Sequence, residues 1–272
     1  MHRSLRRSAS GKLASAALTV SLVVGASGTA PVCRAEDKPK LKGRYNLGPL
    51  QLNPRFRLMS GLDTNVFQTL ANPTRDSVVI LSPRLDGALP VGRRLRLTGS
   101  GYADVFYFRR QDDERSIDFA GEGRAELLLH SVTLFGGGGG GQFTQRFSID
   151  VDDRLPRQEK RAYAGATWQV TRRFSLTGRG ANEIITFSPG EFRLGGSVKE
   201  AMDRNTLSAS GQMRFALTHR TALVVSGEAL EDRFFSQPKT LPPERQSYRA
   251  LAGLEFGERA FLTGHLFAGV RD

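Results

Sequence analysis

The stretch Asp118-Phe119-Ala120-Gly121-Glu122-Gly123-Arg124-Ala125-Glu126-Leu127 follows a period of two residues. Its odd-numbered positions are all apolar or small, whereas four of its five even-numbered positions carry a charge. Successive side chains of a β-strand point to opposite faces, so one face of this segment is free of charge and the other is rich in it. This pattern is typical of a strand that lies between lipid and a water-filled lumen in a transmembrane β-barrel.

The same pattern recurs along the chain and predicts eleven strands. They are expected at residues 54–63, 77–89, 94–108, 117–129, 132–145, 160–170, 174–185, 205–217, 222–233, 246–256 and 261–270. Connections of two or three residues alternate with longer ones at 64–76, 109–116, 146–159, 186–204 and 234–245. Bacterial outer-membrane barrels have short turns at one rim and long loops at the other, so the sequence predicts an all-β, antiparallel up-and-down transmembrane β-barrel.

Aromatic side chains gather at both ends of the uncharged face. Near the short turns these are Trp168, Phe174, Phe215 and Phe256, and near the long loops Tyr107, Phe119 and Tyr248. Two rings of this kind are typical of the interfacial girdles of a membrane barrel. Aromatic residues that close an ordinary β core are the alternative.

The N-terminal segment 1–35 has the form of a cleaved secretory signal. Basic residues precede an apolar run at 13–25, and Cys33-Arg34-Ala35 offers a cleavage site. The run is too short for a membrane-spanning helix, which needs ~20 residues. Cleavage after Ala35 would remove five of the 39 basic residues and none of the 27 acidic ones, which leaves a net charge of +7. The export signal and the barrel pattern together predict that the protein is located in the bacterial outer membrane. Export and the moderate charge argue against a nucleic-acid partner.

The rest of the chain divides into a periplasmic leader at 36–49 and a barrel domain at 50–272. Eleven is an odd number of strands, whereas bacterial single-chain barrels have an even number. We therefore expect either a C-terminally truncated, incomplete barrel or one uncounted strand. Pro83 predicts a bulge or a strand start, and the run Gly136–Gly141 is compatible with a smooth wall or a kink.

Few residues suggest catalysis or metal binding. The histidines lie in the signal (His2), at expected turns (His130, His219) or in a strand without an obvious partner (His265). Asp150, Asp152 and Asp153 could bind calcium from a long loop, but a solvated acidic loop is the favoured explanation. We expect no enzyme activity, no cofactor and no metal site.

The charged face carries the candidate pore-lining residues. The basic ones are Arg57, Arg84, Arg96, Arg124, Arg161, Arg179, Arg214 and Arg249. The acidic ones are Asp63, Asp86, Asp104, Asp118, Glu122, Glu126, Glu183, Glu228 and Glu255. Mixed charge of this kind suits a hydrated channel, and arginine suits anionic solutes because its guanidinium binds carboxylate and phosphate bidentately. Mutual pairing that merely keeps a closed barrel soluble inside is the alternative.

Two short stretches resemble the family of outer-membrane proteins known as β-barrel porin 2. Gly61-Leu62-Asp63-Thr64-Asn65-Val66-Phe67 is similar to an element in the first hairpin of such proteins, and Trp168-Gln169-Val170-Thr171-Arg172-Arg173-Phe174-Ser175-Leu176 to one of their turns. The hairpin architecture matches over roughly 50–272. The resemblance implies fold and location more than substrate.

These patterns together predict a passive, porin-like channel for small, anionic solutes. Its expected partners are outer-membrane lipid, the barrel assembly machinery and the solutes themselves. Two alternatives stay open: a non-conducting structural or assembly barrel linked to surface polysaccharide export, and a soluble secreted β protein.

Overall fold

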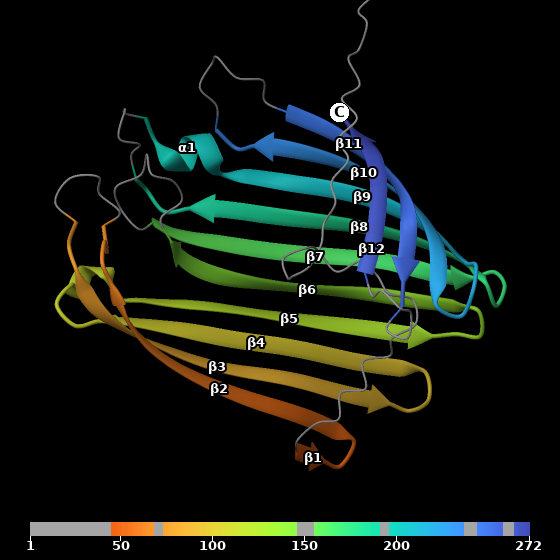
Figure 1. Ribbon diagram of the computed structural model, residues 1–272, viewed down its shortest axis with the longest axis horizontal. Coiled ribbons are helices and arrows are strands. Elements are labelled where there is room, and N and C mark those ends of the chain that lie inside the picture. Colours follow the sequence, from red (N-terminus) through yellow and green to blue (C-terminus); the bar gives the residue numbers. More distant parts are fainter. Residues whose placement is uncertain (1–44, 68–72, 146–154, 191–195, 237–243, 258–263) are drawn as a thin grey trace, which may run out of the picture.

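A computed structural model describes residues 45–67, 73–145, 155–190, 196–236, 244–257 and 264–272. The expected signal and most of the expected leader lie outside these residues, as do Asp150, Asp152 and Asp153. Nearly all described residues form strands of a single curved sheet (Figure 1).

Twelve strands and two short helices follow one another along the chain. The strands are β1 Tyr45–Leu47, β2 Leu50–Asp63, β3 Asp76–Val91, β4 Leu95–Phe108, β5 Ser116–Leu128, β6 Val132–Gln145, β7 Leu155–Gln169, β8 Phe174–Phe187, β9 Arg204–Ala216, β10 Thr221–Phe234, β11 Glu244–Phe256 and β12 Gly264–Arg271. The helices are η1 Asp112–Glu114 and α1 Val198–Met202. No helix within the described ranges is long and apolar enough to cross a membrane.

The sheet has the simplest possible topology, because each strand pairs antiparallel with its neighbours in the chain. This order confirms the predicted all-β, antiparallel up-and-down fold. The sequence predicts about eleven strands and the described residues form twelve; the additional one is β1, a three-residue strand inside the expected leader. The two edges of the sheet do not pair with each other in the described part of the chain, so the wall is open.

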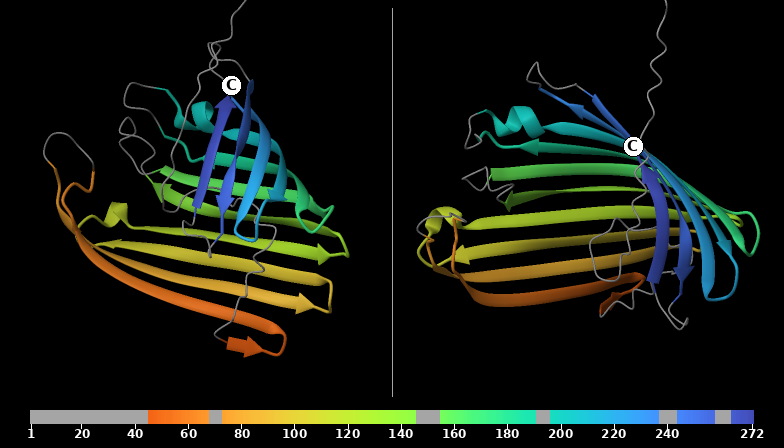
Figure 2. Two further views of the ribbon diagram at one scale, coloured as in Figure 1. Left: turned by 45° about the vertical axis from the view of Figure 1, so that its right-hand side comes forward. Right: turned by 45° about the horizontal axis from the view of Figure 1, so that its top comes forward.

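The curvature of the sheet is large. From β2 to β12 the strands turn progressively, so that β11 and β12 run steeply across the direction of β2–β6 (Figure 2). Twisted strands accumulate such a rotation across a large sheet, which is the geometry from which barrels close.

The connections sort to two rims, as the sequence predicts. Segments 92–94, 129–131, 170–173 and 217–220 are short and meet at one end of the strands, which we call the turn rim. The connections after β2, β4, β6, β8 and β10 are longer and meet at the opposite end, which we call the loop rim. Both helices belong to the loop rim.

Two strands start earlier than their sequence pattern suggests. β2 begins at Leu50, ahead of the predicted strand 54–63, and β7 begins at Leu155, inside the predicted loop 146–159. In β7 the extra residues include Arg157, Gln158 and Glu159, which are polar on both faces. A strand segment with two polar faces has no amphipathic period, so the pattern ends before the strand does.

Pro83 lies in the middle of β3 without a bulge or a break. The register is the same on both sides of it, with Leu81 opposite Val105 and Arg84 opposite Tyr102. Ser82 and Pro83 have no paired residue in the ladder to β4, since proline has no N–H to donate. Pro83 therefore marks a local gap in hydrogen bonding rather than the strand start.

The glycine run lies inside the unbroken strand β6. A Cβ built on Gly139 would meet the carbonyl oxygen of Gly121 on β5, well inside van der Waals contact. On the opposite side, a Cβ on Gly138 would lie 2.8 Å from the carbonyl oxygen of Arg161 on β7. Backbone atoms cannot move away cheaply, so glycine is required where β5, β6 and β7 approach so closely.

Candidate functional site

The register divides the side chains of the sheet into two sets. In the pair β4–β5, Leu97, Gly99 and Gly101 face the same side as Ala125, Gly123 and Gly121. The intervening row contains Arg96 opposite Glu126 and Ser100 opposite Glu122. We call the first side the outer face and the second the inner face.

Every charged residue predicted for one face lies on the inner face. This holds for Arg57, Arg84, Arg96, Arg124, Arg161, Arg179, Arg214, Arg249, Asp63, Asp86, Asp104, Asp118, Glu122, Glu126, Glu183, Glu228 and Glu255. Their position on a common face follows from the backbone register, and their role as pore-lining residues remains a prediction.

The outer face carries a continuous apolar band. On β9 its residues are apolar or small from Leu207 to Phe215, a span of nine residues. A strand tilted by ~45° needs about 9–11 residues to cross the hydrocarbon core of a bilayer. The predicted girdle residues lie on this face, and Trp168, Phe215, Tyr107, Phe119 and Tyr248 are all exposed there.

Many inner-face charges are paired. Glu126 lies 2.8 Å from Arg124 and 3.7 Å from Arg96, and Glu255 lies 3.3 Å from Arg214. Further pairs join Arg249 to Glu228 and Arg55 to Asp86. In β7, the guanidinium of Arg157 lies 2.7 Å from the carboxylate of Glu159. These contacts neutralise much of the positive charge that the arginines bring to this face.

Arginine side chains also cover the aromatic rings of the inner face. The guanidinium of Arg84 lies 5.1 Å from the ring centroid of Tyr102. Tyr163 has Arg179 at 4.4 Å and Arg161 at 5.9 Å. Each cation–π contact of this kind contributes ~0.5–2 kcal/mol and holds the flexible arginine side chain against the wall.

A hollow of about 370 Å³ lies on the inner face over the glycine run. Its floor is the bare backbone of Gly139, Gly140 and Gly141. Its walls come from the strands on both sides and include Arg84, Asp86, Tyr102, Glu122, Glu159, Arg161, Tyr163 and Glu183. The sharp approach of β5, β6 and β7 therefore creates a recess at the centre of the charged face.

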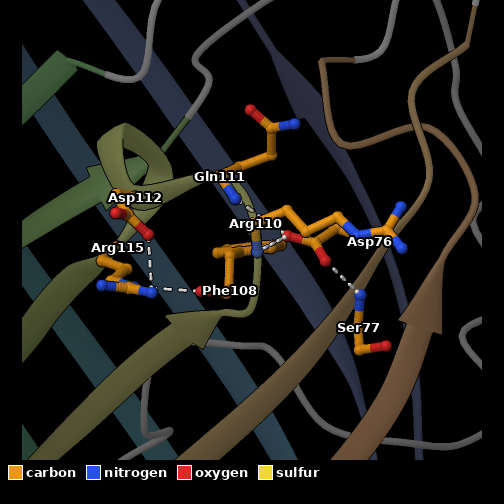
Figure 3. Close-up of polar contacts among 7 residues, drawn as sticks. All are labelled: Asp76, Ser77, Phe108, Arg110, Gln111, Asp112 and Arg115. Atoms are coloured by element: carbon orange, nitrogen blue, oxygen red, sulfur yellow. Dashed lines mark hydrogen bonds and ion pairs between the residues drawn. The ribbon is translucent and has the colours of Figure 1, made fainter.

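Buried aspartates tie neighbouring strands together at the loop rim. The Asp76 carboxylate accepts hydrogen bonds from the backbone N–H groups of Ser77, Arg110 and Gln111, which joins the start of β3 to the segment after β4 (Figure 3). Asp203 similarly accepts from the N–H of Phe187 at 2.6 Å. Each carboxylate satisfies backbone donors that the end of a strand would otherwise leave open.

The pKa of Asp76 reflects these contacts. Burial alone would raise it, but the backbone N–H donors of Arg110, Gln111 and Ser77, together with the charge of Arg110, hold the pKa below its ordinary value of 3.8. Asp76 is thus a carboxylate at neutral pH, in the form that can accept all three hydrogen bonds.

Arg115 makes a second set of polar contacts at the loop rim, near η1. Arg115 reaches Asp112 at 2.6 Å and the carbonyl oxygen of Phe108 at 2.9 Å, which closes the turn around η1 (Figure 3). The guanidinium of Arg115 also lies 4.1 Å from the ring centroid of Tyr107. Polar contacts thus fix the course of the β4–β5 connection.

The β8–β9 connection folds over the inner face. Val198 of α1 is fully buried in a cluster with Leu155, Ile185 and Phe187, and all three of these strand residues belong to the inner face. The N–H of Val198 donates to the carbonyl oxygen of Gly190, which joins two parts of the connection, and the buried side chain of Val198 packs this segment against the sheet. Apolar residues lie elsewhere on the inner face too, such as Ile80 opposite Phe106, but this cluster is the one that a connecting segment covers in the described part of the chain.

Part of the charged and aromatic wall is not among the residues predicted for this face. Arg157 and Glu159 fall in a predicted loop, and Arg55 lies two residues from Arg57 on the same face. Tyr102 and Tyr163 point inward, whereas the predicted aromatic rings lie on the outer face. The period of two in β4 and β7 could have placed both rings inward.

Of the described histidines, His130 and His219 lie in short connections at the turn rim. His265 lies on the inner face opposite Glu255 and stacks on Phe267 at 6.0 Å between ring centroids. The described residues contain no group of three or more His, Cys, Asp or Glu side chains that could hold a metal ion.

No known family model matches the sequence, and no curated protein or solved structure matches it. The resemblance to β-barrel porin 2 proteins is therefore untested by these comparisons. What the chain does must be inferred from the two faces of its sheet.

Proposed function

We propose that this chain forms the wall of a bacterial outer-membrane β-barrel that acts as a passive, porin-like channel for small polar solutes. The observation that carries the proposal is the opposition of the two faces. One is apolar over the length of a membrane crossing, and the other bears the arginines and carboxylates. Lipid requires the first kind of surface, and a hydrated passage requires the second.

The outer face favours membrane insertion over a soluble fold. Large apolar side chains are exposed along the strands, among them Leu97, Leu127 and Leu223. A contiguous surface of this kind in water would be an aggregation hazard. In lipid the same surface is solvated, and aromatic residues at its two borders suit the interfaces.

The inner face favours a wet passage with modest ion selectivity. Arg96, Arg124, Arg214 and Arg249 each lie beside a carboxylate, so their charge is largely compensated. The expected preference for anions therefore depends on the remaining arginines, chiefly Arg84, Arg161 and Arg179. A closed channel also requires that the strand edges of β2 and β12 be paired, by further strands or by another copy.

One observation favours the rival proposal of a non-conducting structural barrel. The apolar cluster of Val198, Leu155, Ile185 and Phe187 lies on the inner face at the loop rim. Such a segment narrows the passage and, in a small barrel, would plug it. The two proposals share fold and location and differ only in conductance.

The test is fractionation followed by electrical recording. We expect the protein in the outer-membrane fraction, with its N-terminus at Glu36, and discrete conductance steps after reconstitution into planar bilayers. Recovery from the soluble periplasm would exclude the membrane proposal. Outer-membrane recovery with silent bilayers, also after deletion of residues 191–202, would favour the structural barrel.

A further inference from the structure

A carboxylate and a guanidinium face each other across the hollow without meeting. Glu122 on β5 is opposite Gly139 on β6, and Gly139 is opposite Arg161 on β7. Adjacent strands are ~4.8 Å apart, so the two charged residues start about two strand spacings from each other. Nothing but the glycine backbone lies between them in this row.

The gap between the two charges is built into the backbone. A side chain at Gly139 would collide with the Gly121 carbonyl oxygen and with Glu122 itself. Among the described residues, Glu122 forms no ion pair, and Arg161 has only its contact with Tyr163. Both charged ends are therefore available to a solute.

The remaining charges of the hollow balance. Asp86 and Glu159 are compensated by Arg55 and Arg157, which lie outside the lining. This leaves two carboxylates, Glu122 and Glu183, against two guanidiniums, Arg84 and Arg161. A hollow with no net charge but with separated charges attracts neither cations nor anions as a class. It favours a molecule that carries both signs.

We propose that the hollow binds a small zwitterion of the α-amino acid type. Its carboxylate would take two parallel hydrogen bonds from the Arg161 guanidinium, and its ammonium group would donate to Glu122. The volume of about 370 Å³ lies at the lower end of the ~300–1,000 Å³ of small-molecule sites, which suits a compact solute. Tyr102 and Tyr163 provide an apolar flank for its side chain.

This inference rests on the proposed channel only for the route by which a solute reaches the hollow. Binding itself needs the folded inner face and not conduction. Equilibrium binding to the purified protein in detergent micelles therefore separates the two proposals: a silent bilayer leaves the binding result standing, and absent binding leaves the conductance result standing.

The experiment compares four probes of similar size by saturation-transfer NMR titration. They are L-alanine with both charges, propionate with the negative charge, propylamine with the positive charge, and lactamide with neither. We expect L-alanine to bind at least about tenfold more tightly than each of the others, since each lacks at least one charge-assisted contact. Equal affinity for L-alanine and any one of the other three would overturn the proposal.

Two variants locate the site and a third controls for the face. Glu122→Gln and Arg161→Gln should each weaken L-alanine binding about tenfold, while propionate binding should fall only in Arg161→Gln and propylamine binding only in Glu122→Gln. Glu228→Gln removes a carboxylate from the same face outside the hollow and should leave all affinities unchanged. Unchanged L-alanine affinity in both hollow variants, with the heat-resistant folded form retained on gels, would refute the assignment.

Discussion

The outer and inner faces of the same strands are built on different rules. On the outer face, most positions away from the loop rim meet one requirement, to be apolar or small, and each meets it independently of its neighbours. On the inner face, a charged residue also needs an oppositely charged partner within reach. Arg214 of β9, for example, contacts Glu255 of β11 across the intervening strand β10. The period of two in the sequence predicts the face on which a residue lies. Which residue it contacts depends on the curvature of the sheet, which the period does not predict.

The largest expected effect comes from placing a charge on the wrong face. Ala209 points outward and Ser208 inward from adjacent positions of β9. Ala209→Arg should reduce the free energy of unfolding of the protein in lipid vesicles by about 2–4 kcal/mol if the site lies near the midplane. Ser208→Arg should reduce it far less. Urea titrations of the refolded variants measure both values. Equal losses at the two positions would show that the faces are not lipid and lumen.

The glycine run provides a second test, this time within the inner face. Gly139→Ala forces a methyl group against the Gly121 carbonyl oxygen, and we expect a loss of about 1–3 kcal/mol from overpacking. Gly123 on the neighbouring strand has no atom within 4 Å of the equivalent position. Gly123→Ala, on the outer face of β5, is the control for adding a methyl group to a strand glycine with free space, and it should be neutral or slightly stabilising in the same titration. If both substitutions cost the same, the close approach of β5 and β6 is not what selects glycine.

At the loop rim, hydrogen bonds to buried carboxylates add to the packing of the apolar cluster around Val198. Asp203→Ala removes the acceptor for the Phe187 N–H and should destabilise the fold by about 1–3 kcal/mol, because a buried donor is left without a partner. Asp203→Asn keeps an acceptor oxygen and should recover a large part of the loss. Hydrogen exchange at the Phe187 amide reads the contact directly, and slow exchange in Asp203→Ala would contradict this account.

The ion pairs predict a small selectivity effect in a conducting channel. Replacing Arg124, Arg179 and Arg214 by Ser leaves Glu255 without its arginine partner and leaves Glu126 with Arg96 alone, at 3.7 Å. The reversal potential in a salt gradient should then move toward cation preference, by only a little because two of the removed charges were compensated. Intact conductance with an unchanged reversal potential would place these side chains outside the conducting path.

The smallest effect concerns pH at the loop rim. The folded-state pKa of Asp76 lies below its ordinary value, so this carboxylate stabilises the fold at pH values above about 4. The contribution should disappear as the pH falls from there through the lowered pKa. Asp76→Asn should remove this part of the acid dependence while leaving the rest. The free energy of unfolding is measured between pH 5 and pH 2 for the unchanged protein and for Asp76→Asn. The same dependence on pH in both would show that Asp76 contributes nothing to the acid sensitivity.

The strands could be predicted from the sequence to within a few residues because one of their faces obeys a strict period. The missed pieces lack that period: β1 is too short to show it, and the start of β7 has polar residues on both faces. The face of Arg161 and Glu122 was predictable, but the hollow between them was not. It depends on how closely β6 approaches its neighbours, which six successive glycines permit but do not specify.

The chain-order pairing of the strands has a consequence for how such a wall can change in size. Every strand hydrogen-bonds only to the strands before and after it, so a hairpin is a self-contained unit of the wall. Adding or deleting one hairpin alters contacts at a single seam and leaves all other registers in place. The circumference grows with the number of strands. Duplication of a short stretch of gene, about thirty codons for two strands and their connections, is thus enough to widen the lumen without redesigning the rest of the protein.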